Sequence, residues 1–239
     1  MVFPNELNQI LVENGISLTD QQHAQFARYF ELLVEWNEKM NLTGITEVGE
    51  VYLKHFYDSL TLAFHVDLSK VSTIADIGAG AGFPSMPLKI AFPHLKLTIV
   101  ESLNKRITFL KEVVSELGLE DVTFHHGRAE DMGRAPGLRD TFDLVTARAV
   151  ARLNVLSELC MPFVRPGGVF AAMKGAKADE EVAEAHKACK VLKGRVRASF
   201  ALTLPLEQSE RSIILVDKVE ATPKMYPRKA GTPNKQPIV

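Results

Sequence analysis

The sequence has few of the features that mark secreted, metal-binding or membrane proteins. Its 239 residues include two cysteines, Cys160 and Cys189, without a CxxC or metal-ligand spacing around them. We therefore expect reduced thiols in the core of a cytoplasmic protein, and no metal site. The longest uncharged run, residues 77–88, is shorter than the roughly 20 residues of a membrane helix. No lysine or arginine precedes Arg28, so no secretory signal is expected.

The chain also lacks a net excess of charge, with 28 basic and 29 acidic side chains. The distribution is nevertheless uneven. Residues 1–70 carry ten acids and four bases (−6), residues 71–220 nineteen acids and twenty bases (+1), and residues 221–239 four bases and no acid (+4). A polyanionic partner would therefore meet only part of the surface.

The apolar pattern divides the chain at the same boundaries. Residues 1–70 are predicted to form helices packed on the core, and Thr19 or Asp20 is the expected cap of one of them. Residues 71–220 alternate helices with short apolar runs, which is typical of an α/β fold with a mostly parallel, Rossmann-like sheet. Residues 221–239 form a basic tail that we expect to be irregular.

Seven extended runs are expected in the sheet, and the last two predict an antiparallel hairpin at its end. These runs are residues 73–77, 95–100, 122–124, 142–147, 169–173, 195–204 and 212–219. Helical patterns cover residues 51–64 and 104–117, the second followed by Gly118.

A glycine-rich loop follows the first expected strand, with Gly78, Gly80 and Gly82 within five residues. Glycines at such a turn allow positive φ and a close approach to a ligand, and this edge of an open α/β sheet is where ligands bind. A dinucleotide is disfavoured, because the third glycine comes one residue too early for G-x-G-x-x-G. Pro84 and Pro87 also remove N–H donors that a phosphate would need. S-adenosylmethionine, which has no phosphate, fits better.

Two later acids support this cofactor. Glu101 ends the second strand, placed to accept the ribose hydroxyls, and Glu130 follows the third, beside the expected adenine site. Taken singly, Glu101 is as well explained as a solvated strand end and Glu130 as an ordinary acid at a helix start. In order after successive strands, they indicate a class I S-adenosylmethionine-dependent methyltransferase.

The strand at 142–147 should end beside the transferring methyl. It lacks the Asn/Asp-Pro-Pro-Tyr of amine methyltransferases, and no cysteine is placed as a C5 nucleophile. Guanine N7 carries a free lone pair and needs neither the Asn/Asp-Pro-Pro-Tyr motif nor a cysteine nucleophile. It has only to be held in line with the methyl group at ~3–3.5 Å, so no general base is expected. Arg148 either positions the base through guanine O6 or forms a salt bridge that shapes the cofactor pocket.

Seven motifs are distributed along nearly the whole chain, at residues 37–46, 55–59, 76–84, 101–106, 128–130, 148–149 and 226–233. Together they resemble the ribosomal RNA small subunit methyltransferase G family, also called glucose-inhibited division protein B, and the overall pattern is similar to Bacillus-type members. The resemblance implies N7 methylation of a guanine in the 530 loop of 16S rRNA. It also implies a set of cofactor contacts, which are Gly78, Phe83, Glu101, Ala129, Glu130 and Arg148.

Gly80, Gly82 and Ser102 complete the candidate cofactor-binding set. The candidate RNA-binding residues are Asn41, His55, Lys174, Arg211, Arg228 and Lys229. Asn41 and His55 are included through the family motifs, since His55 alone reads as a satisfied helix histidine. The tail is alternatively a disordered basic terminus.

The expected partner is 16S rRNA or the 30S subunit, with a monomeric enzyme. Two alternatives stay open, a methyltransferase acting on a small molecule or protein, and a non-catalytic RNA-binding assembly factor.

Overall fold

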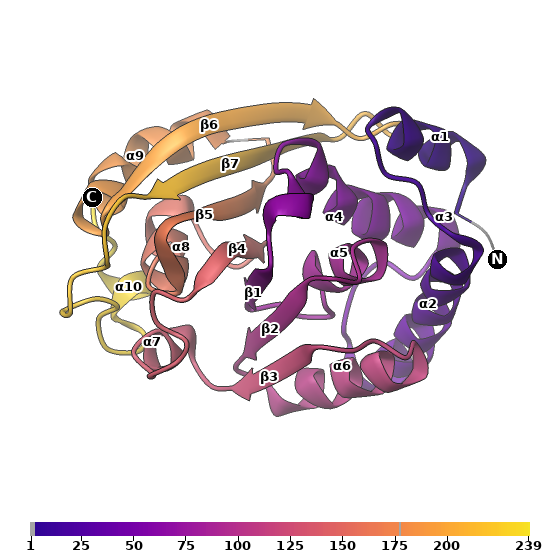
Figure 1. The fold of residues 1–239 in the computed structure, drawn as a ribbon, viewed down its shortest axis with the longest axis horizontal. Helices are drawn as coiled ribbons and strands as arrows, with labels where there is room; N and C mark the ends of the chain where they lie inside the picture. The colour runs from indigo at the N-terminus through magenta and orange to yellow at the C-terminus, as the bar shows by residue number, and fades with distance from the viewer. Residues whose placement is uncertain (1–2, 177) are drawn as a thin grey trace.

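A seven-stranded sheet forms the centre of the protein in the computed structural model, which describes residues 3–176 and 178–239 (Figure 1). The strands are β1 (Thr73–Ile77), β2 (Lys96–Glu101), β3 (Val122–His126), β4 (Phe142–Arg148), β5 (Val164–Lys174), β6 (Gly194–Thr203) and β7 (Glu210–Lys218). Their order across the sheet is β3-β2-β1-β4-β5-β7-β6. Strands β1 to β5 run parallel, and β7 is antiparallel to β5 and β6. The order reverses between β1 and β4, where open sheets bind ligands.

Helices precede the sheet and connect its strands. They are α1 (Asn5–Glu13), α2 (Asp20–Met40), α3 (Val48–Val51), the π-helix η1 (Tyr52–Tyr57), α4 (Asp58–Leu60), the 3-10 helices η2 (Thr61–Phe64) and η3 (Leu68–Lys70), α5 (Ser85–Ala91), α6 (Asn104–Glu116), α7 (Ala129–Met132), α8 (Leu153–Cys160), α9 (Ala178–Val191) and α10 (Thr232–Lys235). Among the described residues, no helix is both long and apolar enough to cross a membrane.

Apolar residues on the two faces of the sheet form two cores. Ile74 belongs to one, with the N-terminal helices, α5 and α6, whereas Ala75 and Ile77 belong to the other, with α8 and α9. This alternation is the period of two expected of a β-strand, and it explains why both faces are covered by helices. The predicted fold class, a mostly parallel Rossmann-like sheet ending in an antiparallel hairpin, is confirmed. Figure 1 shows α2 alongside α6.

The N-terminal helices follow local signals closely. Thr19 caps α2 in a capping box with Gln22, and the helix ends at Asn41 in the left-handed conformation (φ +50°). The helical pattern of residues 51–64 continues through α3, η1, α4 and η2. Their apolar side chains share a core with the sheet, while the division of the chain at residues 70 and 220 stays a prediction.

Two sequence-based expectations need correction. The fifth strand begins at Val164 and not at residue 169, because Val164 already pairs with Phe142 of β4, before a register shift that precedes the pairing of Val169 with Leu144. The tail is not irregular throughout, since Thr232–Lys235 form α10. Cys160 and Cys189 are buried free thiols in α8 and α9, as predicted.

Candidate active site

The glycine loop connects β1 to α5 and is tied to the end of β2. Gly78, Gly80 and Gly82 all have positive φ, at +74°, +63° and +100°. The Gly78 N–H donates to the Val100 carbonyl at 2.8 Å, and the Gly80 N–H donates to Glu101 Oε2 at 3.1 Å. The loop backbone therefore lies beside the buried Glu101 carboxylate, as the order of the motifs predicts.

Gly82 lies on the core side of this loop. A Cβ there would be 2.6 Å from Tyr29 Oη and 2.6 Å from Met86 Cγ. The Tyr29 hydroxyl donates to the Ala81 carbonyl at 2.5 Å, so α2 holds the loop on the side that faces the core. Close packing is thus one reason for a glycine at this position, and a cofactor contact by its backbone stays a prediction.

A cavity of about 200 Å³ lies at the ends of β1, β2 and β3. It is lined by Ile77, Gly78, Val100, Ser102, Gly127, Arg128, Ala129, Glu130, Val150, Leu159 and Asn234. Four predicted cofactor residues lie here, namely Gly78, Ser102, Ala129 and Glu130. We call this space the loop cavity. Gly80, Phe83, Glu101 and Arg148 are outside its lining, although Glu101 accepts the Leu103 N–H at 2.9 Å and the Ser102 hydroxyl at 3.3 Å.

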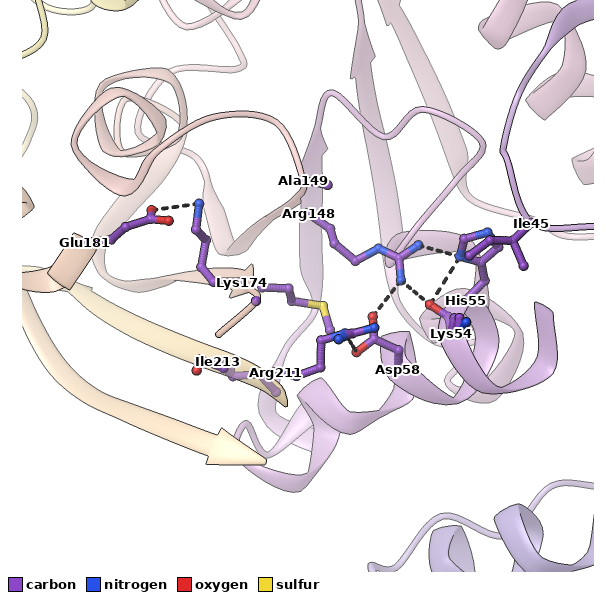
Figure 2. A pocket seen from close by; sticks show the side chains of 13 residues that line it. Ile45, Lys54, His55, Asp58, Arg148, Ala149, Lys174, Glu181, Arg211 and Ile213 are labelled. Carbon is purple, nitrogen blue, oxygen red and sulfur yellow. Dashed lines mark hydrogen bonds and ion pairs between the residues drawn. The ribbon is translucent and has the colours of Figure 1, made fainter. Parts of the chain in front are cut away.

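A second cavity, of about 400 Å³, lies at the ends of β4 and β5 beside the π-helix (Figure 2). Its lining has seven charged or titratable side chains, which are Lys54, Glu181 and a group of five, His55, Asp58, Arg148, Lys174 and Arg211. We call this space the arginine cavity. The sequence singled out four of these five and placed them in separate elements, and the fold brings them together.

Arg148 is the centre of this cluster. Its guanidinium donates to Asp58 Oδ2 at 2.7 Å, to the Lys54 carbonyl at 2.9 Å and to His55 Nδ1 at 3.2 Å. It also lies 5.0 Å from the centre of the Phe83 ring, within reach of a cation–π interaction. Figure 2 shows the side chain of Arg148 directed at these three groups. The salt bridge considered for Arg148 is present, and it faces the arginine cavity.

His55 is neutral in this arrangement. Nδ1 lies 3.2 Å from both the Arg148 guanidinium and the Lys54 carbonyl, and Nε2 lies 2.9 Å from Thr43 Oγ1. Because Arg148 can only donate, its contact requires the tautomer in which Nδ1 accepts and Nε2 carries the proton. The ring stacks on Phe83 with centroids 4.5 Å apart. Burial, and then the neighbouring Arg148 charge, lower the pKa of His55 to about 4. Both ring nitrogens are therefore engaged at neutral pH.

Asp58 lies with His55 in the sequence motif at residues 55–59, which by itself gave no role to Asp58. Its side chain is buried, and Oδ2 pairs with Arg148 while Oδ1 lies 3.6 Å from Arg211 Nε, outside hydrogen-bond distance. Burial raises the pKa of this carboxyl, against the effect of Arg148. Its three-residue spacing from His55 on a helix is the signal that would have found it.

Two other predicted RNA contacts already have protein partners. Lys174 donates to the Ala151 carbonyl at 2.7 Å and pairs with Glu181 at 2.8 Å. Arg228 makes several contacts to the buried Glu158 carboxylate, the shortest at 2.6 Å. A phosphate at either side chain would compete with a carboxylate.

Asn41 and Lys229 are exposed and lie outside both cavity linings. Within the described parts of the chain, no group of three or more His, Cys, Asp or Glu side chains could hold a metal ion.

Comparison with solved structures shows the fold. A S-adenosylmethionine-dependent O-methyltransferase from Thermotoga maritima aligns with a TM-score of 0.50 and 20% identity, covering 78% of this chain and 71% of that one. The [4+2]-cyclase SpnF aligns with a TM-score of 0.55 and 12% identity, covering 69% of this chain and 82% of its own. Because one fold serves both a methyltransferase and a cyclase, this likeness does not identify the reaction.

Sequence comparison does identify the family. The family model described as rRNA small subunit methyltransferase G matches residues 22–213. A protein of that name from Bacillus velezensis is 60% identical over 228 residues, or 95% of each chain. Another from Listeria monocytogenes is 58% identical and covers 98% of this chain and 99% of its own. The resemblance noted in the motifs is confirmed, and this chain belongs to the rRNA small subunit methyltransferase G family.

Proposed function

We propose that the protein transfers a methyl group from S-adenosylmethionine to N7 of a guanine in 16S rRNA. One observation carries the proposal: the two cavities adjoin at consecutive residues. Arg148 and Ala149 line the arginine cavity, and Val150 lines the loop cavity. Methyl transfer requires donor and acceptor atoms within roughly 3–3.5 Å of each other, so a cofactor site and an acceptor site must adjoin. The family is one of methyltransferases, which agrees with this reading.

The loop cavity fits S-adenosylmethionine. A Cβ at Gly78 would lie 3.1 Å from Val150 on a backbone with φ +74°, so a larger residue would be strained and would narrow this part of the cavity. Backbone groups of the loop, with Ser102 and the segment at Ala129, offer polar partners to an amino acid and a ribose, and the buried Glu101 lies beside this lining. When bound, the cofactor supplies an electrophilic methyl group on a sulfonium.

The arginine cavity supports an acceptor that reacts without a base. His55, which is the obvious candidate for a base, has both nitrogens engaged and a pKa of about 4. Guanine N7 is unprotonated at neutral pH and needs only to be held in line. The residues of this cavity then bind and orient the base, and Arg148 acts as a positioning residue.

An unpaired oxygen of Asp58 favours guanine as the acceptor base. Its Oδ1 is a buried acceptor with no hydrogen-bond donor among the described residues. Guanine presents N1–H and N2–H donors on one edge, and an acceptor, O6, that Arg211 or Lys174 can bind. Asp58 would thus read the edge of guanine opposite to the reacting N7.

The remaining parts of the proposal concern the substrate as a whole. Asn41, Arg228 and Lys229 are proposed to contact RNA phosphates around the cavity, and Tyr226 to stack on a base. The small basic surface favours an assembled 30S particle as substrate, because ribosomal proteins then supply part of the recognition. The enzyme acts as a monomer, and an rRNA substrate locates it in the cytoplasm.

The test is transfer of labelled methyl from S-adenosylmethionine to 30S particles, naked 16S rRNA and total protein, with the product identified. We expect label in 7-methylguanosine, strongly reduced by Arg148→Ala and unchanged by Lys70→Ala on the exposed surface. Label in another base overturns the N7 assignment, and label in protein or a small molecule supports that alternative.

Cofactor binding without any transfer supports the assembly factor. A salt titration distinguishes an RNA substrate from a small-molecule substrate. RNA binding weakens log-linearly with salt concentration through counterion release, whereas small-molecule binding hardly changes.

A further inference from the structure

We propose that the C-terminal tail, residues 221–239, forms the wall of the loop cavity at its adenine end, and that Asn234 binds the adenine ring. The inference rests on the proposed use of S-adenosylmethionine. Asn234 lies in α10 and is the one residue of the tail in the lining of this cavity among the described residues. It lies more than a hundred positions after Ala129 and Glu130, which line the same space.

The tail is fastened along its length by two arginines that precede β4. Arg139 donates to the carbonyls of Thr222 and Tyr226 at 2.7 and 2.9 Å. Arg134 donates to the carbonyls of Met225 and Pro227 at 3.0 and 2.5 Å. The two guanidinium groups donate hydrogen bonds to backbone carbonyls that would otherwise be satisfied within a helix or sheet. This segment is therefore held in place although most of it is neither helix nor strand.

Two carboxylates fix the end of the tail next to the cavity. The Glu158 carboxylate accepts the Arg228 N–H at 2.7 Å and its guanidinium at 2.6 Å. Glu130 Oε1 accepts the Gly231 N–H at 2.8 Å. Glu130 is the acid that the sequence assigns to adenine, and here one of its oxygens holds the tail. Asn234 follows three residues later and is exposed, so its amide is available to a ligand.

The direction of the cofactor assigns adenine to this end. The reactive methyl must face the arginine cavity, which adjoins the loop cavity at Val150 after β4. The opposite end of the ligand then extends past β2 toward the segment after β3, where Gly127, Ala129 and Asn234 lie. A primary amide donates and accepts at once, and this matches the amino group and adjacent ring nitrogen of adenine.

The experiment is calorimetric binding of S-adenosylhomocysteine and of S-inosylhomocysteine, in which a carbonyl replaces the adenine amino group. We expect Asn234→Ala to weaken adenosyl binding roughly tenfold, which is about 1.4 kcal/mol, and to bring the ratio of the two affinities toward one. Lys235→Ala, on the same helix but outside the cavity lining, should leave both affinities unchanged. Arg134→Ala, at a residue that is not itself in the cavity lining, releases the tail and should weaken adenosyl binding several-fold.

Equal loss of both ligands in Asn234→Ala, or no loss, overturns the assignment of Asn234. Unchanged affinity in Arg134→Ala overturns the role of the tail as a wall, provided that its tail becomes protease-sensitive. Melting temperatures of the three variants identify any loss of folding. Binding of neither ligand by the unmodified protein contradicts the proposed cofactor, and thereby this inference with it.

Discussion

The Arg148 guanidinium lies 2.7 Å from the Asp58 carboxylate and joins the end of β4 to the N-terminal helices. The two residues are 90 positions apart in the sequence. Both side chains are largely removed from water, with 15% and 4% exposure. Both members of this ion pair line the arginine cavity. The proposed acceptor site therefore consists of groups from the sheet and from the helices that precede it.

Removing one member of this pair should be costly. Arg148→Ala leaves Asp58 buried without its nearest cation, and we expect a loss of about 3 kcal/mol in the free energy of unfolding. Asp58→Asn in the same chain should restore part of it, because the uncompensated charge is gone. Urea unfolding of the two single variants and the double variant measures this coupling. Strictly additive losses would mean that the two side chains do not stabilise each other.

A carboxylate in the glycine loop should prevent cofactor binding without unfolding the protein. Gly80 has φ +63° and open space around its Cβ position, but its N–H donates to Glu101. Gly80→Asp places a second carboxylate beside Glu101, and we expect roughly 100-fold weaker binding of S-adenosylhomocysteine, or about 2.7 kcal/mol. Gly118→Asp is the matched control, since Gly118 has φ +60°, open space and a position after α6. Equal affinities in the two variants would contradict a ligand at this loop.

A methyl group at Gly82 should act on stability first. It would lie 2.6 Å from both Tyr29 Oη and Met86 Cγ, on a backbone with φ +100°. We expect Gly82→Ala to lower the free energy of unfolding by about 3 kcal/mol, through overpacking and backbone strain. Gly44→Ala, with no atom near its Cβ position, is the control in a thermal melt. A melting temperature equal to that of the control would show that the loop moves freely away from α2.

The lowered pKa of His55 predicts how the free energy of unfolding changes with pH, including the direction of the change. The unfolded chain binds a proton at His55 below about pH 6.5, whereas the folded chain does so only near pH 4. This contribution to stability is therefore complete above pH 6.5 and falls by about 2 kcal/mol on going to pH 5. Asp76 acts in the opposite direction, because burial raises its pKa to about 7 and its contribution is lost as the pH rises from 3.8 to 7.

The contributions of His55 and Asp76 to stability offset each other in the unmodified protein. The contribution of His55 is therefore best measured as the difference in the free energy of unfolding between the protein and a variant without this histidine. Denaturant unfolding of the protein and of His55→Gln, which does not titrate, should show a gap in stability that changes with pH between 5 and 7. A constant gap would mean that the pKa of His55 is the same in the folded and the unfolded chain, as for a ring exposed to water.

Much of the fold follows from local patterns. The strand at Thr73–Ile77 has both of its predicted boundaries, and α6 begins at the predicted Asn104, because apolar runs and helical periodicity are local signals. The early start of β5 was missed, since Pro-Gly-Gly at residues 166–168 is typical of a turn and only the pairing of Val164 with Phe142 of β4 places this segment in the strand. The helix α10 was missed because its four residues carry no periodicity.

The sequence by itself determined the parallel sheet, the glycine loop and the family, since each depends on residue types at short spacing. Only the tertiary structure decided which side chains share a cavity. Asp58 meets Arg148, Glu158 meets Arg228, and Asn234 reaches the loop cavity, across 70 or more positions of sequence. Such pairings depend on how helices pack across a sheet, and this packing is set by the sum of many apolar contacts. No short stretch of sequence contains that information, so the chemistry of the site emerges only when the chain is folded.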